Sequence, residues 1–350
     1  MLPKKGLCRS SRRTIALTAS PIIAVVGSLT YDHIFETERI PKPGESIPST
    51  SLINAHGGKG ANIAVAAYRA SHKRPKDNKV ASKSSVSEGE IRVFLNGAVG
   101  GDELGISLRA GIEEKGIDVT GVLTLPDAKT GQVVVMVEQK TGQSSSLGFK
   151  GANMLFQPRD DGVECLAGDT KSKPDVLITH CTLRLRMVRQ MLETAYKCGV
   201  ETVLSASPAV DLDNATYAHV VHLVFNKHEA AEMSGRVPTD FEDVEVAKET
   251  AAMFVTYGVK YAVITLGEAG AVYATYDGER GYVSAEKNVN VRDTTGAGDS
   301  FLGAYVVDFV RQKQKGEWKI DRAIGFASRA AARTIEQLGS QTALPWADEI

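Results

Sequence analysis

Short apolar runs rich in β-branched residues recur along this chain, and amphipathic stretches separate several of them. The runs predict strands over residues 22–27, 91–98, 175–179, 201–206, 220–225 and 261–266. The intervening segments 187–197 and 245–257 have the apolar spacing of helices. Because a strand that is covered on both faces is apolar throughout, this alternation predicts a mostly parallel sheet with helices on both sides. The expected fold is therefore a doubly wound α/β fold.

Two segments, residues 30–55 and 131–149, depart from this alternation. They contain alternating strand-like residues with Pro and Gly turns, and neither contains a helical pattern. We expect antiparallel strands over about 30–56 and 130–150 that form a small separate sheet beside the main domain. Such a sheet is a candidate lid, since lids exclude water from reactive phosphates.

Composition restricts the partners of the protein. The 350 residues carry a formal net charge of −1, which argues against a nucleic-acid or membrane surface as the main partner. No apolar run approaches the roughly 18 residues that a membrane span needs. Residues 21–350 are predicted as one domain, and residues 71–89 as an exposed insertion without chemistry.

The four cysteines lack C-x-x-C spacing, which indicates thiols in a reducing, cytoplasmic environment. Residues 1–20 are basic and contain no acidic residue, so they fit either a disordered tail or a mitochondrial leader.

The most specific motif occupies residues 288–303. Val289 and Val291 alternate as in a strand, and the apolar residues from Phe301 onward have helical spacing. Gly296-Ala297-Gly298 is therefore expected at the turn that opens a helix, where backbone N–H groups and the helix dipole attract an anion. Asp299 falls in the first helical turn and is a candidate acceptor for the proton of an attacking hydroxyl. A helix-capping Asp would explain the motif alone equally well.

A second motif, Gly57-Gly58-Lys59-Gly60-Ala61-Asn62, precedes another helical pattern. It is not a Walker A loop, because residue 53 is Ile and no Ser or Thr follows the lysine. Lys59 and Asn62 offer hydrogen-bond donors suited to hydroxyl groups. The alternative explanation is a plain turn at a helix N-terminus.

Two further motifs follow predicted strands, at the sheet edge where α/β folds bind ligands. Asn226 and Glu229 come after strand 220–225, and Glu229 is a candidate to hold magnesium-bound waters. Thr265, Gly267 and Gly270 come after strand 261–266, where glycines allow backbone contact with a nucleotide. A helix cap and an ordinary glycine turn remain the alternatives. The histidines show no HExxH or other metal-ligand spacing, and there is no G-x-S-x-G elbow.

Together, these motifs resemble the ribokinase branch of the PfkB carbohydrate kinase family over about residues 22–350. Two signatures carry the resemblance: GGKGAN at 57–62 and DTTGAGDSFLGA at 293–304. Shorter echoes are GSLTYDHI at 27–34, NKHEAAEMSG at 226–235, ITLGEAGAV at 264–272 and GSQTALPW at 339–346.

The resemblance implies a ribokinase-like, Rossmann-like three-layer core with a β lid, which uses ATP, Mg²⁺ and often K⁺. It implies that Asp299 is the catalytic base and that Gly296, Ala297 and Gly298 stabilise the transferring phosphoryl group. The implied sugar-binding positions are Thr30, Asp32, Gly58, Lys59, Asn62 and Thr182, with Asp299. The implied nucleotide positions are Asn226, Thr265, Gly267, Gly270, Gly298 and Ser328, with Glu229 organising magnesium. The implied potassium positions are Asp293, Thr295, Thr334, Gln337, Gly339 and Ala343.

Three positions depart from the ribokinase pattern. Thr30 replaces an Asn, Thr182 replaces a substrate-contacting Glu, and Ala343 replaces a Ser in the potassium loop. The first prediction is an ATP-dependent kinase that converts D-ribose to D-ribose 5-phosphate, with the lid as a candidate homodimer interface. The alternatives are a nucleoside or other sugar kinase of this family, and a non-catalytic sugar or nucleotide sensor. A sensor has no need to keep Asp299 together with the anion-binding glycines.

Overall fold

A computed structural model describes residues 20–75, 90–140, 144–158, 162–170 and 172–350. The basic leader up to residue 19 and residues 76–89 of the predicted insertion lie outside the described residues.

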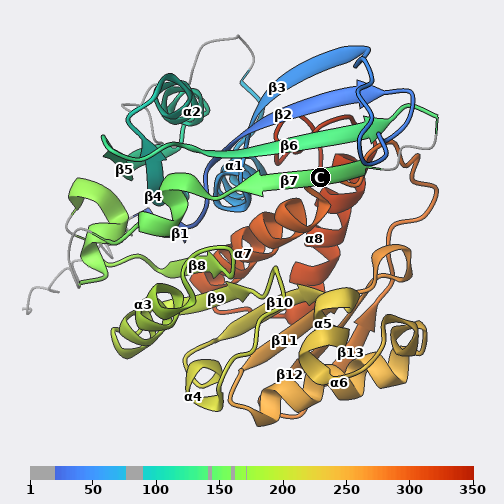
Figure 1. Cartoon of the computed structure of the whole chain (residues 1–350). Helices are drawn as coiled ribbons and strands as arrows, with labels where there is room; N and C mark the ends of the chain where they lie inside the picture. The colour runs from blue at the N-terminus through green and yellow to red at the C-terminus, as the bar shows by residue number, and fades with distance from the viewer. Residues whose placement is uncertain (1–19, 76–89, 141–143, 159–161, 171) are drawn as a thin grey trace, which may run out of the picture.

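The main sheet has nine strands in the order β13-β12-β11-β10-β9-β8-β1-β4-β5 (Figure 1). Their bounds are β1 (Ile22–Val26), β4 (Arg92–Gly100), β5 (Asp118–Leu125), β8 (Val176–His180), β9 (Glu201–Ser205), β10 (His222–Asn226), β11 (Tyr261–Thr265), β12 (Ala271–Thr275) and β13 (Arg280–Val283). Neighbours from β5 to β11 are parallel, whereas β12 and β13 add an antiparallel edge. All six strands predicted for this sheet are present.

Helices cover both faces of the main sheet. They are α1 (Lys59–Ser71), α2 (Glu103–Glu113), α7 (Ala297–Lys315) and α8 (Ile320–Ile335) on one face, and α3 (Leu185–Lys197), α4 (Asn214–Tyr217), α5 (Lys227–Ser234) and α6 (Val244–Thr256) on the other. Short 3-10 helices are η1 (Gly151–Leu155), η2 (Glu164–Thr170), η3 (Pro238–Glu242) and η4 (Gly267–Ala269).

Strand β1 shows why its sequence is apolar at every position. Ile23 and Val25 pack into the core under α1, α7 and α8, whereas Ala24 and Val26 pack into the core under α3, α5 and α6. Because successive side chains point to opposite faces, one central strand contributes to both cores. The predicted doubly wound fold with a mainly parallel sheet is confirmed.

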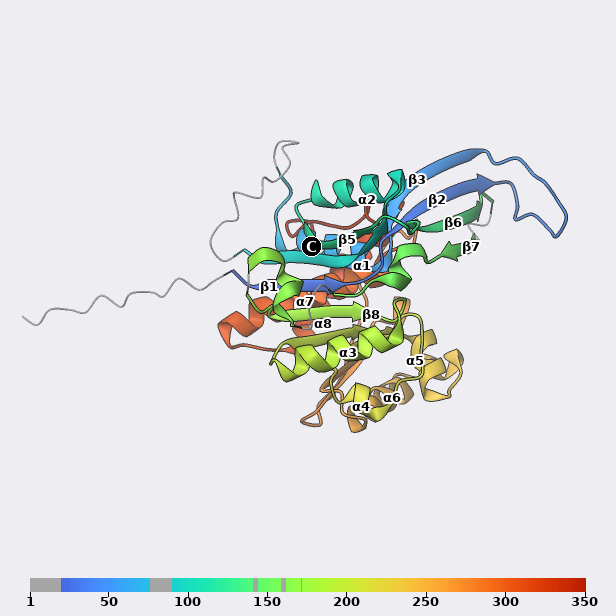
Figure 2. The same ribbon diagram turned by 60° about the vertical axis from the view of Figure 1, so that its left-hand side comes forward.

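A four-stranded small sheet projects from one side of the main sheet (Figure 2). Its order is β3 (Ser51–Gly57), β2 (Thr30–Thr37), β6 (Gly131–Glu138) and β7 (Ser144–Phe149). The two outer pairs are antiparallel as expected, but the central pair β2–β6 is parallel. The all-antiparallel prediction is wrong there because β2 follows β1 and β6 follows β5, so both strands leave parallel strands of the main sheet in the same direction.

The strand expected at Val289 and Val291 is also wrong. No helix or strand lies between β13 and α7, and Val291 is 58% exposed. The backbone N–H groups of Arg292 and Asp293 donate to the carbonyl of Ile335 at the end of α8. Residues 292 and 293 therefore bond to the last turn of α8 and not to a neighbouring strand. In the described part of the chain, none of the helices is long and apolar enough to cross a bilayer.

His222 on β10 is a buried titratable group outside the ligand edge of the sheet. Its Nδ1 lies 2.9 Å from the Tyr305 hydroxyl, and its ring stacks on Tyr261 and meets Phe309 edge to face. Burial lowers the pKa of His222 from 6.5 to about 3. Between these two values the unfolded chain binds a proton that the folded chain does not, so stability is lost as the pH falls.

We expect His222→Asn to flatten the pH dependence of stability, because Asn does not titrate and can still reach the Tyr305 hydroxyl. Between pH 6 and pH 4, the slope of unfolding free energy against pH should fall by about 1.4 kcal/mol per pH unit. Urea unfolding at several pH values measures this slope. The exposed His228→Asn is the control, and equal slopes in all three proteins would contradict the assignment.

Candidate active site

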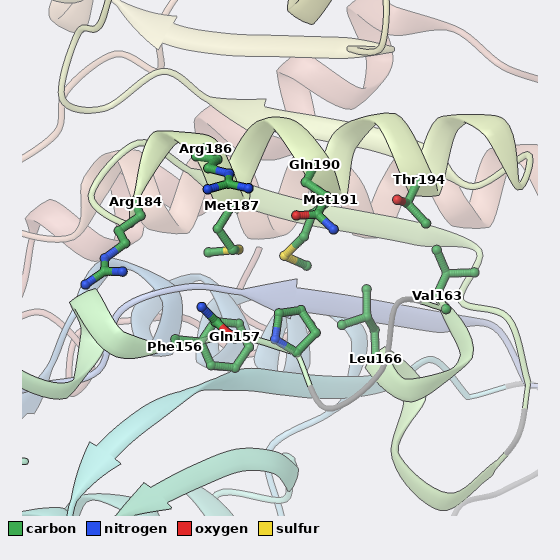
Figure 3. Close-up of a pocket in the computed structure, with 12 residues that line it drawn as sticks. Phe156, Gln157, Val163, Leu166, Arg184, Arg186, Met187, Gln190, Met191 and Thr194 are labelled. Carbon is green, nitrogen blue, oxygen red and sulfur yellow. The ribbon is translucent and has the colours of Figure 1, made fainter. Parts of the chain in front are cut away.

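One cavity is lined by none of the predicted site residues. It has a volume of about 350 Å³ and is lined by Phe156 and Leu166 on one side and by Met187 and Met191 of α3 on the other (Figure 3). The predicted residues instead gather at the carboxyl ends of the parallel strands, the edge at which open α/β sheets bind ligands. Asn226 ends β10 and Thr265 ends β11, and the two are direct partners in register.

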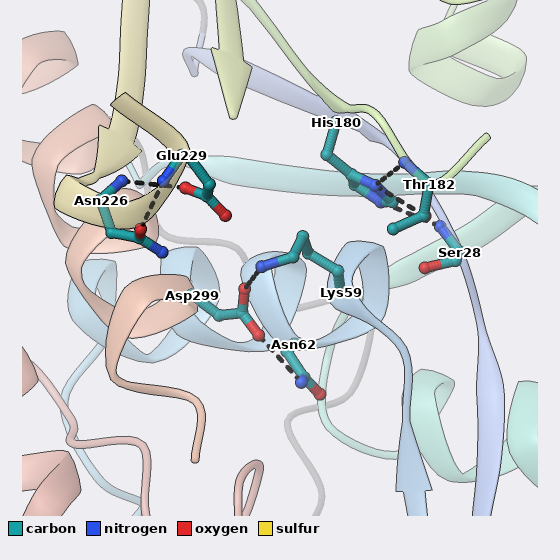
Figure 4. Close-up of polar contacts among 8 residues, drawn as sticks. All are labelled: Ser28, Lys59, Asn62, His180, Thr182, Asn226, Glu229 and Asp299. Carbon is teal, nitrogen blue, oxygen red and sulfur yellow. Dashed lines mark hydrogen bonds and ion pairs between the residues drawn. The ribbon is translucent and has the colours of Figure 1, made fainter. Parts of the chain in front are cut away.

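Asp299 is held by the second motif. Helix α7 begins at Ala297, after Gly296 in the left-handed conformation, and Asp299 lies in its first turn with 7% of its surface exposed. Its Oδ1 lies 3.2 Å from Lys59 Nζ, and its Oδ2 accepts a 3.0 Å hydrogen bond from Asn62 Nδ2 (Figure 4). Two motifs 240 residues apart therefore form one polar cluster.

A C-terminal loop supports this cluster from behind. Asn62 Oδ1 accepts a hydrogen bond of 3.0 Å from Gln341 Nε2, so the Asn62 amide has a fixed orientation. The guanidinium of Arg69 donates to the carbonyls of Gln341 and Leu344 at 2.9 Å and 2.7 Å. Because both partners of Asn62 are buried, its Nδ2 is directed at Asp299 and its Oδ1 away from it.

The glycines of the two motifs serve different purposes. A Cβ on Gly60 would lie 2.5 Å from Gly27 Cα, and a Cβ on Gly57 would overlap the Asp32 carboxylate. These two glycines permit close backbone packing and leave space for Asp32. A Cβ on Gly298 would meet no atom within 4 Å. Gly298 therefore borders open space at the positive end of α7, as an anion site requires.

Asp32 lies on β2, in register with Ala55 and Val133 of the small sheet. Thr30 Oγ1 donates to Asp32 Oδ1 at 2.7 Å. Burial raises the pKa of the Asp32 carboxyl above 3.8, and the Thr30 hydrogen bond opposes this shift. The small sheet thus contributes a carboxylate that is oriented before any ligand binds.

Of the predicted nucleotide positions, Asn226 and Glu229 lie at the start of α5, whereas Thr265, Gly267 and Gly270 lie at and just after the end of β11. Asn226 caps α5: its Oδ1 accepts from the backbone N–H groups of His228 and Glu229, and Glu229 Oε2 accepts from the Asn226 N–H. The capping explanation is therefore correct for Asn226, although its side-chain N–H₂ remains at the ligand edge (Figure 4).

The glycines after β11 also differ from each other. Gly267 faces open space at φ +66, whereas a Cβ on Gly270 would collide with the Val283 carbonyl. Gly267 can approach a ligand, and Gly270 is explained by packing. Ser328 is partly buried on α8.

Two of the predicted potassium positions, Thr295 and Gly339, contact the Asp293 carboxylate. Its Oδ1 accepts from the Thr295 N–H at 2.9 Å and its Oδ2 from the Gly339 N–H at 2.8 Å. The Gln337 N–H donates to the Thr334 carbonyl. Among the described residues there is no cluster of three His, Cys, Asp or Glu side chains that would hold a metal. A cation here would rely on one carboxylate and backbone carbonyls, a donor set that suits K⁺. Ala343 is buried and supplies no hydroxyl.

Comparison with known proteins decides the family. The sequence profile of the pfkB family carbohydrate kinases matches residues 21–347. The chain belongs to the pfkB carbohydrate kinase family. A ribokinase of Schizosaccharomyces pombe is 31% identical over 92% of this chain and 94% of its own length. A deoxyribokinase of Salmonella typhi is 30% identical over 92% of this chain and 95% of its own length.

The solved structures agree on the fold. An Arabidopsis thaliana ribokinase, complexed with ribose and ATP, superposes with a TM-score of 0.78 at 24% identity, over 95% of this chain and 97% of that one. The predicted recognition of the family and the predicted enzyme class, an ATP-dependent phosphotransferase with an alcohol acceptor, are confirmed.

His180 is a polar residue at the site to which sequence reasoning gave no role. It ends β8, is fully buried, and lies between the turn at Ser28 and the predicted substrate residue Thr182 (Figure 4). Its place at the carboxyl end of a parallel strand, two residues before Thr182, was the available signal.

The contrast between the glycines of this pfkB kinase can be tested. Gly298→Ala should fold with unchanged or slightly higher stability, because it adds a helical methyl group in open space. It should nevertheless weaken ATP binding if the open space at Gly298 is the predicted anion site, because the methyl group would occupy that space. Gly60→Ala should instead cost about 1–3 kcal/mol of unfolding free energy through overlap with Gly27. Thermal melts and nucleotide titrations measure both effects. Loss of stability in Gly298→Ala with ATP affinity retained would contradict this interpretation.

Proposed function

We propose that this pfkB-family kinase transfers the γ-phosphoryl group of ATP to the hydroxymethyl group of a pentose, with D-ribose as the preferred substrate and D-ribose 5-phosphate as the product. The observation that carries the proposal is the buried carboxylate of Asp299 at the start of α7, bonded to Lys59 and Asn62. The relative named ribokinase and the Arabidopsis structure with ribose and ATP support the choice of sugar and nucleotide.

In the proposed reaction, Asp299 accepts the proton of the sugar hydroxyl. The resulting oxygen attacks the γ-phosphorus of ATP, the bond to the β–γ bridging oxygen breaks, and ADP leaves. Backbone N–H groups at Gly296, Ala297 and Gly298 lie at the positive end of α7 and are the proposed donors to the transferring group. The Ala297 N–H donates to the Thr294 carbonyl at 3.3 Å in this structure, so it would exchange that partner for a phosphoryl oxygen. The open space at Gly298 supports this assignment, because the phosphoryl oxygens need room there.

The remaining sugar contacts are proposed for groups on either side of Asp299. Asp32 comes from the small sheet, and Lys59 and Asn62 come from the start of α1. Gly58 is the N-cap of α1, and its carbonyl accepts from the Asn62 N–H at 2.9 Å. A carboxylate, an ammonium and an amide together can accept from and donate to several hydroxyls of one sugar.

Two cations are part of the proposal. Mg²⁺ would supply charge neutralisation between the phosphates of ATP, with Glu229 as the residue that holds its water ligands. The Asp293 loop, with Thr295, Thr334, Gln337, Gly339 and Ala343, is the proposed potassium position. A cation there would strengthen the positive field at the start of α7, because Asp293 and Gly296 belong to the same turn segment.

We propose that the small sheet acts as a lid and as a dimer contact. Asp32 lies on one face of this sheet, and the strand register places Leu52, Leu147 and Phe149 on the other face. All three are more than half exposed. An apolar face of this kind is typical of a protein contact, and a second copy of the chain is the proposed partner. Cys165, Cys181 and Cys198 form no disulfide, which fits the cytoplasmic location predicted from the sequence.

The departures at Thr30 and Thr182 favour testing a second substrate class in parallel. The Salmonella relative is named deoxyribokinase, so a deoxy sugar or a nucleoside is the alternative acceptor. A non-catalytic sensor is disfavoured because Asp299 is buried with two oriented donors beside open space for an anion. One ADP-release assay with D-ribose, 2-deoxy-D-ribose and nucleosides separates these functions.

Asp299→Asn should lower kcat with D-ribose by about two to four orders of magnitude, because an amide cannot accept the proton. The substitution keeps the shape of the side chain, so ATP binding should change little. The melting temperature should fall, because the neutral amide leaves Lys59 without its ion pair and can no longer accept from both Lys59 and Asn62. ADP release under saturating substrates measures the effect. The matched control is Asp321→Asn, an exposed carboxylate at the start of α8. Turnover near that of the control would remove Asp299 as the base.

Thr30→Ala should move the acid limb of the kcat/KM profile for the sugar to higher pH. The Thr30 hydrogen bond lowers the pKa of Asp32, so its loss lets burial raise that pKa further. The ionised form of Asp32 is then lost at a higher pH as the solution is acidified. Thr30→Ser keeps the hydroxyl and should retain the native limb. The profile is measured from about pH 4 to pH 8, and identical limbs in both variants would exclude Asp32 as the group that titrates.

A further inference from the structure

His180 connects three parts of the site through its two ring nitrogens. Its Nε2 lies 3.1 Å from the backbone nitrogen of Ser28, at the turn between β1 and β2. Its Nδ1 lies 2.9 Å from Thr182 Oγ1 and 3.3 Å from the Thr182 backbone nitrogen. The ring is fully buried, and a Cβ on Gly27 would overlap it. The position of this imidazole is therefore fixed by packing as well as by hydrogen bonds (Figure 4).

These contacts determine where the ring proton lies. A backbone N–H can only donate, so a neutral imidazole with one proton can accept from Ser28 or from the Thr182 backbone, but not from both. The Ser28 contact is the shorter, and His180 is the partner of this buried N–H. Nε2 is then the acceptor and Nδ1 carries the proton. The Thr182 hydroxyl oxygen is the group at 2.9 Å that can accept this proton.

The charge state of the ring agrees with this arrangement. Burial, and then the nearby Lys59 ammonium, lower the pKa of His180 from 6.5 to about 3. A protonated ring would also direct an N–H at the Ser28 N–H, which the geometry disfavours. His180 therefore stays neutral, in one tautomer, throughout the pH range in which a kinase is assayed.

The fixed tautomer determines the role of the neighbouring hydroxyl. When Thr182 Oγ1 accepts from His180, its own proton is left to donate to another group. Thr182 is partly exposed, and Figure 4 draws its contacts with the His180 ring. At this position the chain therefore offers a hydrogen-bond donor.

We infer that His180 is a positioning residue that makes Thr182 a hydrogen-bond donor, so that this part of the pocket selects a sugar that presents an acceptor oxygen there. The inference rests on the proposed kinase function and specifies which substrates that site takes. A sugar hydroxyl satisfies the donor with its oxygen, as does an acceptor such as fluorine or an ether oxygen. A deoxy position leaves the Thr182 proton without a partner, and sites of this type discriminate against such analogues.

The tautomer can be measured directly on the full-length protein. Nitrogen-15 NMR of the histidine side chains, with His180 assigned by its loss in His180→Gln, should show a proton on Nδ1 and none on Nε2. The signal should not titrate between pH 5 and pH 9. A proton on Nε2, or titration in this range, would overturn the inference whatever the protein phosphorylates.

The effect on specificity is measured with D-ribose and its 2-deoxy, 3-deoxy, 2-deoxy-2-fluoro and 3-deoxy-3-fluoro analogues. At one ring position, the native enzyme should use the fluoro sugar better than the deoxy sugar. Thr182→Val should lower kcat/KM for ribose by about 3- to 10-fold, mainly through KM, and abolish the preference for fluorine. Thr182→Glu should reverse that preference, because an ionised carboxylate only accepts hydrogen bonds. Thr194→Val, a half-buried threonine of α3 outside the site, is the matched control.

Two His180 variants test whether His180 orients the Thr182 hydroxyl or only stabilises the fold. His180→Gln keeps an acceptor for Ser28 and a donor for Thr182, so it should retain the preference for fluoro over deoxy sugars. His180→Leu should lose it, and adding Thr182→Val to His180→Leu should change specificity no further. If the enzyme phosphorylates ribose but Thr182→Val keeps the native preference, the inference is wrong and the proposed function stands. If it phosphorylates none of these sugars, the proposed function fails, and the NMR result alone decides the tautomer.

Discussion

The contact of Asp299 with Lys59 and Asn62 is the interaction on which the site depends. It joins the first turn of α7 to the first turn of α1, two helices that pack on the same face of the main sheet. A nearly buried carboxylate is costly unless donors satisfy it, and removing one partner of such a pair is strongly destabilising. The ammonium and the amide meet that requirement, and they leave the carboxylate beside open space at Gly298. The same contact therefore stabilises the fold and places a base next to an anion site.

The supporting structure keeps this contact in place from both sides. Behind it, Arg69 fixes the C-terminal loop, and Gln341 of that loop orients Asn62. In front of it, Gly60 lets α1 begin directly against the end of β1. The Ser28 N–H, in the turn that follows β1, donates a hydrogen bond to Nε2 of His180. The candidate site is thus held by side chains that already have partners, and preorganisation of this kind reduces the ordering cost of binding.

Much of this arrangement could be predicted from the sequence, because its signals are local. A continuously apolar strand has to be covered on both faces. Strand β1 meets this expectation, because Ile23 and Ala24 pack into the cores on opposite faces of the sheet. The helix start at Ala297 follows from small residues before an apolar helical pattern. The parallel pairing of β2 with β6 could not be predicted, because register between strands about a hundred residues apart leaves no local signal. The strand predicted at Val289 is wrong, because an alternating pattern in one segment does not show that a neighbouring strand is available to pair with it. The role of His180 was missed because a tautomer depends on distant contacts.

The central claim is that Asp299 receives the proton of the sugar hydroxyl. The most direct measurement is a crystal structure of the native protein with D-ribose and a non-hydrolysable ATP analogue. Our account predicts that the sugar hydroxymethyl oxygen lies within hydrogen-bond distance of Asp299, between this carboxylate and the γ-phosphorus, with Asn62 still bonded to Asp299. A sugar bound with its hydroxymethyl group directed away from Asp299, while Lys59 and Asn62 keep the carboxylate fully occupied, would contradict it.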